Sequence, residues 1–387
     1  MIDINDSLSL SKAIEQIKPE SRFLVDTFFP NIMPPALTKM VGVEYRKYGR
    51  NLAPYVVSGG HGVNIGRAGS IMKYYAPPLL GARRIVSPED IEHRDFGEQP
   101  IYTTMTPAER ASRIQSRDLK ELSGMVENRK NQMASEILST GKLTLRGYAD
   151  DGVTPRDDSI SFDWDGKMTP KIPWNNSNAD ILGDLERASE KIQEDAGQIP
   201  TVMIVGKNVA RYLLKNAEIL SWLLIPSREN FALMSMQPKL TSPQIMRIGL
   251  IQMLNLEIYS YFETYQDESG NLRNYIDDNL IIIGIPGFGS QLYGSITLLN
   301  NNGQFETYST QLLPHYHANQ DTQSLALTVY SRVILVPTVV DSWISMNVLD
   351  STSSQENGST SINSDLTGSD LDYGSEIAGS NVSLPGL

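Results

Sequence analysis

The clearest pattern of apolar and polar positions lies between Thr106 and Gly141, where apolar residues recur every three or four positions and charged and other polar residues fill most of the rest. Thr106 is a good N-cap, Pro107 takes the first helical position, and Glu109 completes a capping box. Gly141 can end the helix in a left-handed conformation. The pattern therefore predicts one helix over 107–140, a rod of about 50 Å at ~1.5 Å per residue.

Shorter patterns on either side predict further elements. Helical spacing predicts helices at 10–17, 181–196, 208–215 and 241–254. Alternating or continuous apolar runs predict strands at 201–205, 257–263, 280–285, 291–299, 304–310, 324–330 and 332–336. The turn at Asn302-Gly303 joins the strands at 291–299 and 304–310. Because helices and antiparallel strands occur in separate runs, the fold class is α+β.

The stretch from Val41 to Val86 predicts a long two-stranded excursion. Apolar residues alternate with polar ones from Val41 to Tyr45, and the glycines of 59–62 mark a loop tip. An isolated hairpin is marginally stable, so we expect it to lie on another surface, such as a second subunit. The stretch has one acidic residue, Glu44, and seven basic residues that we take as interface candidates: Arg46, Lys47, Arg50, Arg67, Lys73, Arg83 and Arg84. A solvated basic face is the alternative.

Length and composition limit the function classes. A chain of 387 residues exceeds what one hydrophobic core normally serves, so we expect more than one packed unit. The net charge of -12 argues against a dedicated nucleic-acid binder. The absence of cysteine excludes disulfides, zinc–thiolate sites and thiol nucleophiles. The N-terminus lacks a signal-peptide pattern, and glycines and a proline interrupt the uncharged stretch 279–305, which predicts buried strands and no membrane span.

Composition changes at Asp350. The segment 350–387 has six acidic residues, no basic ones, and is otherwise mostly Ser, Gly, Asn and Thr, so it cannot fold alone. We expect it to be either a solvated acidic tail or an extended arm that neighbouring subunits hold in place. In the second case its apolar side chains would lie in surface grooves, and the candidates are Leu366, Leu371, Tyr373 and Leu384.

Motifs that carry chemistry are scarce. There is no nucleophile elbow, no zinc-protease helix motif and no phosphate-binding loop. His315 and His317 share one side of a strand but have no obvious third ligand, so we interpret them as structural or solvated. The segment 163–166 resembles the start of a calcium loop with its glycine two positions early, which favours an acidic hairpin turn. The sequence thus predicts no catalytic residue, no cofactor and no metal.

Several short motifs occur in an order that is similar to one protein family. They are Phe28-Phe29-Pro30, Leu52-Ala53-Pro54-Tyr55-Val56, Pro77-Pro78, the run from Arg84 to Asp90, Glu136 to Lys142, Trp174, Gly197 to Thr201, and Ser331 to Pro337. In this order, over residues 20–345, the chain resembles the lambda-type major capsid (head) proteins of tailed bacteriophages, which have the Hong Kong 97-type fold.

The resemblance implies a division of the chain. It implies an N-terminal arm at 1–40, an extended E-loop at 41–95, a peripheral domain at 96–177 with spine helix 107–140, an axial domain at 178–290, and peripheral-domain strands at 291–349. The acidic arm 350–387 has no counterpart in the family. We expect no proteolytic maturation domain before the arm, and hence a separate scaffolding protein. Some relatives join Lys to Asn of a neighbour covalently, but we expect no such link from Lys47 or Lys73.

The implied function is structural. Hexamers and pentamers of the chain would form the icosahedral shell of the virion around double-stranded DNA, without specific DNA binding, after assembly in the host bacterial cytoplasm. The implied partners are the chain itself, a scaffolding protein and a portal, with no membrane, and the use of a decoration protein stays open. Two alternatives remain open: a bacterial nanocompartment (encapsulin-like) shell of the same fold, and a soluble hydrolase or carbohydrate-active enzyme that uses paired carboxylates.

Overall fold

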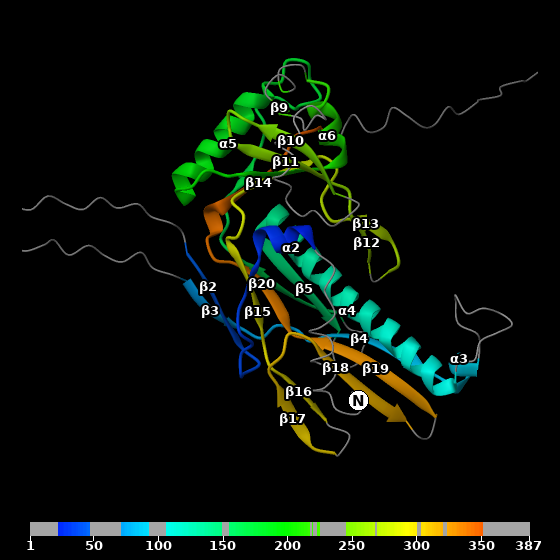
Figure 1. Cartoon of the computed structure of the whole chain (residues 1–387). Helices are drawn as coiled ribbons and strands as arrows, with labels where there is room; N and C mark the ends of the chain where they lie inside the picture. The colour runs from blue at the N-terminus through cyan, green and yellow to red at the C-terminus, as the bar shows by residue number, and fades with distance from the viewer. Residues whose placement is uncertain are drawn as a thin grey trace, which may run out of the picture. The chain divides into compact units, whose positions relative to one another are not determined.

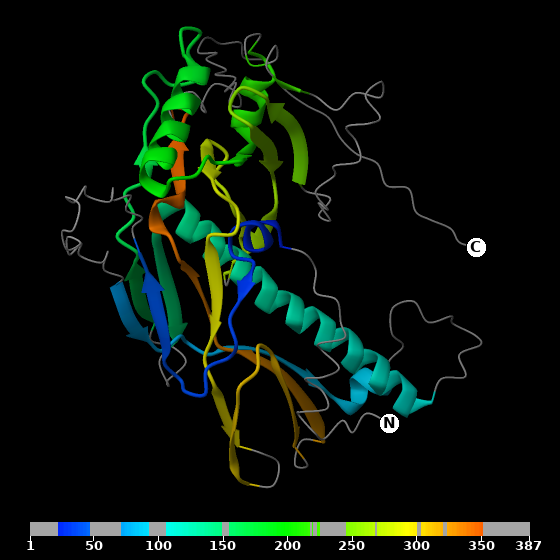
Figure 2. The ribbon, with the colours of Figure 1, turned by 60° about the vertical axis from the view of Figure 1, so that its left-hand side comes forward.

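The structure is a computed structural model that describes residues 22–46, 71–92, 106–148, 155–216, 219, 223–224, 245–267, 269–299, 303–319 and 323–350. Three apolar clusters organise these residues, and the long helix α4 (Pro107–Thr140) contributes to two of them. Figures 1 and 2 show α4 running diagonally past the sheets. The expected helix at 10–17 and the expected loop tip at 59–62 lie outside the described residues.

Both ends of α4 are as the sequence predicts. The N–H of Glu109 donates to the Thr106 hydroxyl at 3.3 Å, and the Glu109 carboxylate accepts the N–H of Thr106 at 2.8 Å. These hydrogen bonds lower the pKa of Glu109. At the other end Gly141 has φ 68°, and its N–H donates to the carbonyl of Ile137. The predicted helix 107–140 is therefore confirmed, including its capping box.

A seven-stranded mixed sheet carries the second cluster. Its order is β7 (Lys167–Met168), β21 (Trp343–Asn347), β14 (Leu280–Gly284), β8 (Val202–Val205), β11 (Leu256–Tyr261), β10 (Ile245–Ile251) and β9 (Leu223–Leu224). Helices α5 (Ile181–Ala196) and α6 (Lys207–Leu213) place their apolar residues against it, and Figure 1 shows them on this sheet. The predicted helices at 181–196 and 208–215 are confirmed.

The main cluster lies where the C-terminal half of α4 meets strands from distant parts of the chain. It includes α2 (Phe23–Phe28) and residues of the hairpins β2 (Val41–Tyr45)–β3 (Ile71–Tyr75) and β5 (Lys142–Tyr148)–β6 (Pro155–Ser161). It also includes residues of β15 (Gly289–Tyr293) and β20 (Val333–Pro337), which form one sheet with β1 (Asn31–Ile32). One face of the seven-stranded sheet completes it with Val202, Ile204 and Ile282. At its centre the fully buried Trp343 ring stacks on Phe288 at 4.9 Å and on Trp164 at 5.4 Å.

The third cluster joins the first half of α4 to a three-stranded sheet. That sheet has the order β18 (Leu313–Asn319), β19 (Ser324–Ser331), β4 (Leu80–Val86). Leu119, Leu122 and Val126 of α4 pack on its inner face. The remaining elements are α3 (Pro88–Glu92), a short 3-10 helix at Val340–Ser342, and the hairpins β12 (Thr264–Gln266)–β13 (Leu272–Asn274) and β16 (Ile296–Leu299)–β17 (Phe305–Tyr308).

The predicted helix at 241–254 is wrong, because its described part forms strand β10 and a turn. β10 has a β-bulge between Arg247 and Gly249, which moves the residues after it to the opposite face. Ile245 thus packs in the main cluster, while Ile248 and Ile251 pack in the second. A bulged strand with both faces covered spaces its apolar residues three apart, like a helix.

Two other expectations need correction. The predicted strand 291–299 is two strands, β15 and β16, which pair in different sheets. The break falls at Gly294, where a Cβ would lie 2.9 Å from the carbonyl oxygen of Lys39, so only glycine fits. The segment 163–166 is not a hairpin turn, because β6 pairs with β5 whereas β7 pairs in parallel with β21.

The uncharged stretch before Glu306 forms strands β14, β15 and β16, as predicted. Within the ranges described above, none of the helices combines the length and the apolarity needed to cross a bilayer. The observed mixture of helices and largely antiparallel sheets confirms the α+β class.

Candidate subunit interface

The structure describes four of the eleven interface candidates: Arg46, Lys73, Arg83 and Arg84. The other seven lie outside the described residues, and they are Lys47, Arg50, Arg67, Leu366, Leu371, Tyr373 and Leu384. The four described residues have different surroundings.

Lys73 is held by its own subunit. β2 and β3 pair antiparallel, with Val43 opposite Lys73. Lys73 therefore shares a face with Val43 and Tyr45, whose side chains are buried in the main cluster. The Lys73 ammonium donates to the Tyr45 hydroxyl at 3.3 Å, and that hydroxyl donates to Asp163 at 2.8 Å. Burial and the Asp163 hydrogen bond raise the pKa of Tyr45, so the phenol stays protonated.

The opposite face of this hairpin is apolar and exposed. Tyr74 stands opposite Gly42, and Met72 stands opposite Glu44. Tyr74 is 66% exposed and Met72 is 52% exposed. Their side chains lie over Gly42, where a Cβ would come within 2.9 Å of the Met72 methyl carbon. The alternation of side chains along 72–75 places Met72 and Tyr74 on one face, but selecting interface candidates by charge leaves both residues out.

Arg83 and Arg84 point to opposite faces of β4. Arg84 reaches α4, where it lies 2.7 Å from Asp118 and 2.6 Å from Glu121. The Asp118 hydrogen bond raises the pKa of Arg84, although partial burial opposes the shift. Arg83 is exposed on the outer face and pairs in register with Thr328, which in turn stands opposite His315. Arg84 is thus a structural residue of the subunit, and Arg83 remains available.

Arg46 follows β2 at the start of the hairpin excursion. Its N–H donates to the carbonyl of Thr338 at 3.1 Å, and its carbonyl accepts the N–H of Val340 at 3.4 Å. These bonds anchor the backbone to the end of β20, while the residue itself is exposed. The chain therefore leaves the main core at a fixed point.

His315 and His317 lie on the outer face of the β18–β19–β4 sheet. Burial lowers the pKa of His315, a hydrogen bond with the backbone of Leu299 opposes the shift, and the neighbouring His317 adds to it. His317 is exposed. Across the described ranges there is no group of three or more His, Asp or Glu side chains placed to hold a metal ion.

A polar network, which the sequence analysis did not anticipate, lies buried midway along α4. Lys130 donates to Tyr293 at 3.2 Å and pairs with Glu127 at 2.6 Å. Burial works to lower the pKa of Lys130, but Tyr293 and Glu127 outweigh it and raise the pKa, so the ammonium stays charged. The next residue, Asn131, donates to the Tyr261 hydroxyl at 2.7 Å.

The second half of this network joins α4 to the N-terminal part of the described chain. Glu263 accepts hydrogen bonds from Tyr261 and Asn131, and Arg22 pairs with it at 3.0 Å. Burial and Glu263 raise the pKa of Tyr261 far above its ordinary value, so this phenol donates. We interpret the network as structural, since the Glu263 side chain is only 8% exposed.

Comparison with known proteins identifies the family. The family model described as phage major capsid protein E matches residues 6–348. No curated protein matches the chain. Among solved structures, one described as a prophage capsid protein from E. coli CFT073 superposes with a TM-score of 0.64 at 16% identity, over 90% of this chain and 99% of that one.

Two further structures are more distant. The Mycobacterium phage Che8 structure gives a TM-score of 0.38 at 14% identity, over 80% of this chain and 84% of that one. The holo-SrpI encapsulin complex from Synechococcus elongatus PCC 7942 gives 0.44 at 11% identity, over 87% and 89%. The family match, which spans all three apolar clusters, confirms the resemblance seen in the sequence. The chain belongs to the phage major capsid protein E family, and it is a phage capsid protein of the virion with the Hong Kong 97-type fold.

Proposed function

We propose that this protein forms an icosahedral shell of hexamers and pentamers that encloses double-stranded DNA. The observation that carries the proposal is the exposed apolar outer face of the β2–β3 hairpin, where Tyr74 is 66% and Met72 is 52% exposed. An exposed apolar surface of this kind is typical of a site where another protein binds. A second copy of the chain is the partner that fits, because capsid proteins of the family assemble with themselves.

The division of the chain into arm, E-loop, peripheral domain and axial domain remains part of this proposal. The main cluster and the third cluster would form the peripheral domain, with α4 as its spine, and the second cluster would form the axial domain. In that case the axial domain takes β7 and β21 from outside the expected range 178–290, because both strands pair in the seven-stranded sheet.

The E-loop would dock on a neighbouring subunit through two kinds of contact. Its apolar outer face would be covered by the neighbour, and the basic residues that its own subunit does not engage would meet acidic residues. Among the described residues these are Arg46 and Arg83, both exposed, whereas Lys73 and Arg84 have partners within the subunit. An exposed ion pair adds about 0–1 kcal/mol, but the contact repeats at every subunit of a shell.

The remaining partners follow from the proposed role. We propose a separate scaffolding protein and a portal, assembly in the host cytoplasm, and a structural and not a catalytic function, while the use of a decoration protein stays open. The net charge of -12 suits a container that encloses DNA without binding it tightly. The segment 350–387, with its six acidic residues, would lie across adjacent subunits as a clamp.

Electron microscopy of the purified full-length chain, produced with and without its phage's other head genes, tests the proposal. We expect closed shells, and virions of the phage should contain this chain as their main protein. A small monodisperse particle under both conditions would contradict the shell function. Shells that contain an enzyme cargo, with no portal or terminase gene beside the coding gene, would favour the nanocompartment alternative.

A further inference from the structure

The tip of the β16–β17 hairpin carries an exposed apolar pair. Leu299 and Phe305 stand opposite each other as cross-strand partners, 51% and 78% exposed. One step down the same face, the hydroxyls of Thr297 and Thr307 hydrogen-bond at 2.9 Å, which fixes the register of the hairpin. The two apolar side chains therefore form an apolar knob of fixed register, and among the described residues about half or more of each side chain is left exposed.

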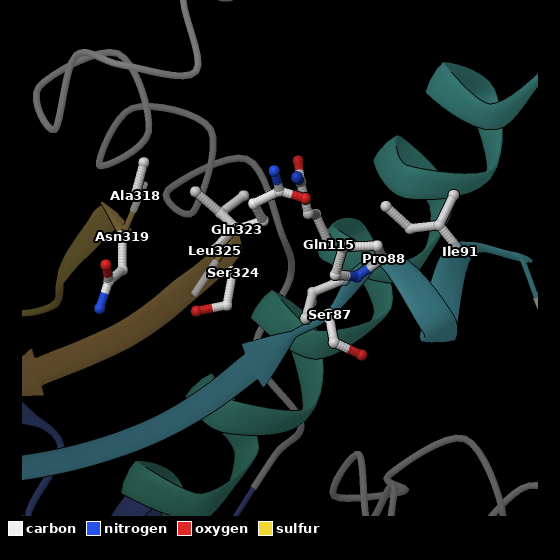
Figure 3. Close-up of a pocket in the computed structure, with 10 residues that line it drawn as sticks. Ser87, Pro88, Ile91, Gln115, Ala318, Asn319, Gln323, Ser324 and Leu325 are labelled. Atoms are coloured by element: carbon white, nitrogen blue, oxygen red, sulfur yellow. The ribbon is translucent and has the colours of Figure 1, made fainter. Parts of the chain in front are cut away.

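A pocket lies where β4 and β18 end and β19 begins, as Figure 3 shows. It has a volume of about 510 Å³, within the range of sites that hold small molecules or inserted side chains. Its walls are apolar, from Val86, Pro88, Ile91, Ala318 and Leu325. The side chains that complete the lining are uncharged amides and hydroxyls, which places no desolvated charge in the way of an apolar occupant.

The knob of the same subunit does not fill this pocket. None of the lining residues comes from β16 or β17, and Figure 1 shows these two strands apart from α3, which contributes Pro88 and Ile91 to the pocket. The two features match in chemistry and sit at different places on one chain. Such a pair generates head-to-tail contacts, which close into rings or shells when the rotation between copies allows it.

We propose that the knob of Leu299 and Phe305 inserts into the pocket of a second copy of this chain. The inference rests on the proposed self-assembly and names one contact that carries it. The apolar lining residues, Leu325 and Pro88 among them, are the surface that matches the Phe305 ring. The contact is heterologous, because each subunit offers its knob to one neighbour and its pocket to another.

Site-directed crosslinking tests the contact cleanly, since the chain has no cysteine of its own. One batch carries Gln304→Cys, beside the knob, and a second carries Asn319→Cys, at the pocket; both keep Phe305 and the apolar walls. The two batches are assembled together and treated with a short bis-maleimide. We expect a crosslinked dimer in the mixture at least about fivefold above either batch assembled alone, as a heterologous contact requires.

The controls separate the possible failures. Gln304→Cys mixed with Leu272→Cys, another highly exposed position, should give no dimer above background. In the crosslinkable pair, adding Phe305→Ser should remove the dimer while the unfolding midpoint of the free subunit stays unchanged, because Phe305 is exposed. Shells that form without the mixed dimer, or a dimer from Gln304→Cys alone, would overturn the inference and leave the shell function standing. Failure of the unmodified chain to assemble would overturn both.

Discussion

The guanidinium of Arg84 on β4 lies 2.7 Å from the carboxylate of Asp118 on α4, and it ties the outer sheet to the long helix. Asp118 is almost fully buried, so it depends on this partner. The adjacent Arg83 points the other way. Two consecutive basic residues that look equivalent in the sequence therefore have separate tasks, one within the subunit and one on its surface.

Arg84→Glu should destabilise the isolated subunit. The substitution leaves the buried carboxylate of Asp118 beside a second negative charge, which we expect to lower the free energy of unfolding by about 1–3 kcal/mol. Urea unfolding of the unassembled subunit, followed by circular dichroism, measures the change. A variant as stable as the unmodified chain would show that the pair contributes little to the fold.

Arg83→Glu is the matched control for the fold and the test for the interface. Because Arg83 is exposed, its reversal should leave the unfolding midpoint unchanged while the yield of shells falls. Sedimentation of assembly reactions at low and at high salt measures the yield. Normal shells at low salt, where surface charge acts most strongly, would eliminate an electrostatic role for this residue.

Gly141→Ala should be more harmful than an ordinary glycine substitution. Gly141 has φ 68°, and a Cβ there would lie 2.5 Å from the Trp164 ring. Backbone strain and overlap together should cost about 2 kcal/mol or more. Gly270→Ala is the control, since Gly270 has φ 83° but the nearest atom to a Cβ there, Gln266 Nε2, is at an ordinary contact distance of 3.6 Å, so it reports backbone strain alone. Equal losses from both variants would contradict the role of the Trp164 contact.

His315 should make the subunit less stable in mild acid. Its folded pKa is lowered from 6.5 mainly by burial, so the unfolded chain binds a proton first as the pH falls. The stabilisation is complete above pH 6.5 and is lost as the pH falls from there toward the folded pKa. Unfolding free energies at about pH 7.5 and about pH 5.5 measure the loss, which His315→Asn should reduce. The same reduction from the exposed His317→Asn would contradict this assignment.

Deletion of residues 351–387 tests the proposed clamp. If the acidic segment lies across neighbours, its removal should lower the thermal midpoint of assembled shells and leave the midpoint of the free subunit unchanged. Differential scanning calorimetry of both forms measures the two midpoints. An unchanged shell midpoint and assembly yield would mean that the segment acts only as a solvated acidic tail.

Helix α4 could be predicted to the residue because its signals are local. Thr106, Pro107 and Glu109 specify the start within four positions, and Gly141 specifies the end. Strand β10 could not be predicted, because its bulge at Arg247 depends on how β11 pairs with it across a turn. The spacing of Ile245, Ile248 and Ile251 then imitates a helix, and only the tertiary context resolves the ambiguity.

The interface candidates show a similar limit. Alternation within β4 predicts that Arg83 and Arg84 face opposite sides, but it does not say which side holds α4. In the same way, Lys73 is exposed, but it stands opposite the buried Val43 and its ammonium donates to Tyr45 of the same subunit. Charge could be read from the sequence, whereas the direction of each side chain followed from the packing of distant segments.

The polar network at the middle of α4 has a consequence for the uniqueness of the fold. Apolar side chains tolerate small sliding or rotation of a helix, since any apolar neighbour serves nearly as well. Lys130 and Asn131 do not, because a shift of one residue would separate Lys130 from Tyr293, and Asn131 from Tyr261 and Glu263. A buried group that loses its hydrogen-bond partner costs about 1–3 kcal/mol, although Lys130 keeps its ion pair with Glu127 and Glu263 keeps Arg22. The network thus favours one axial position of α4, so that every copy of the chain presents the same surface to its neighbours.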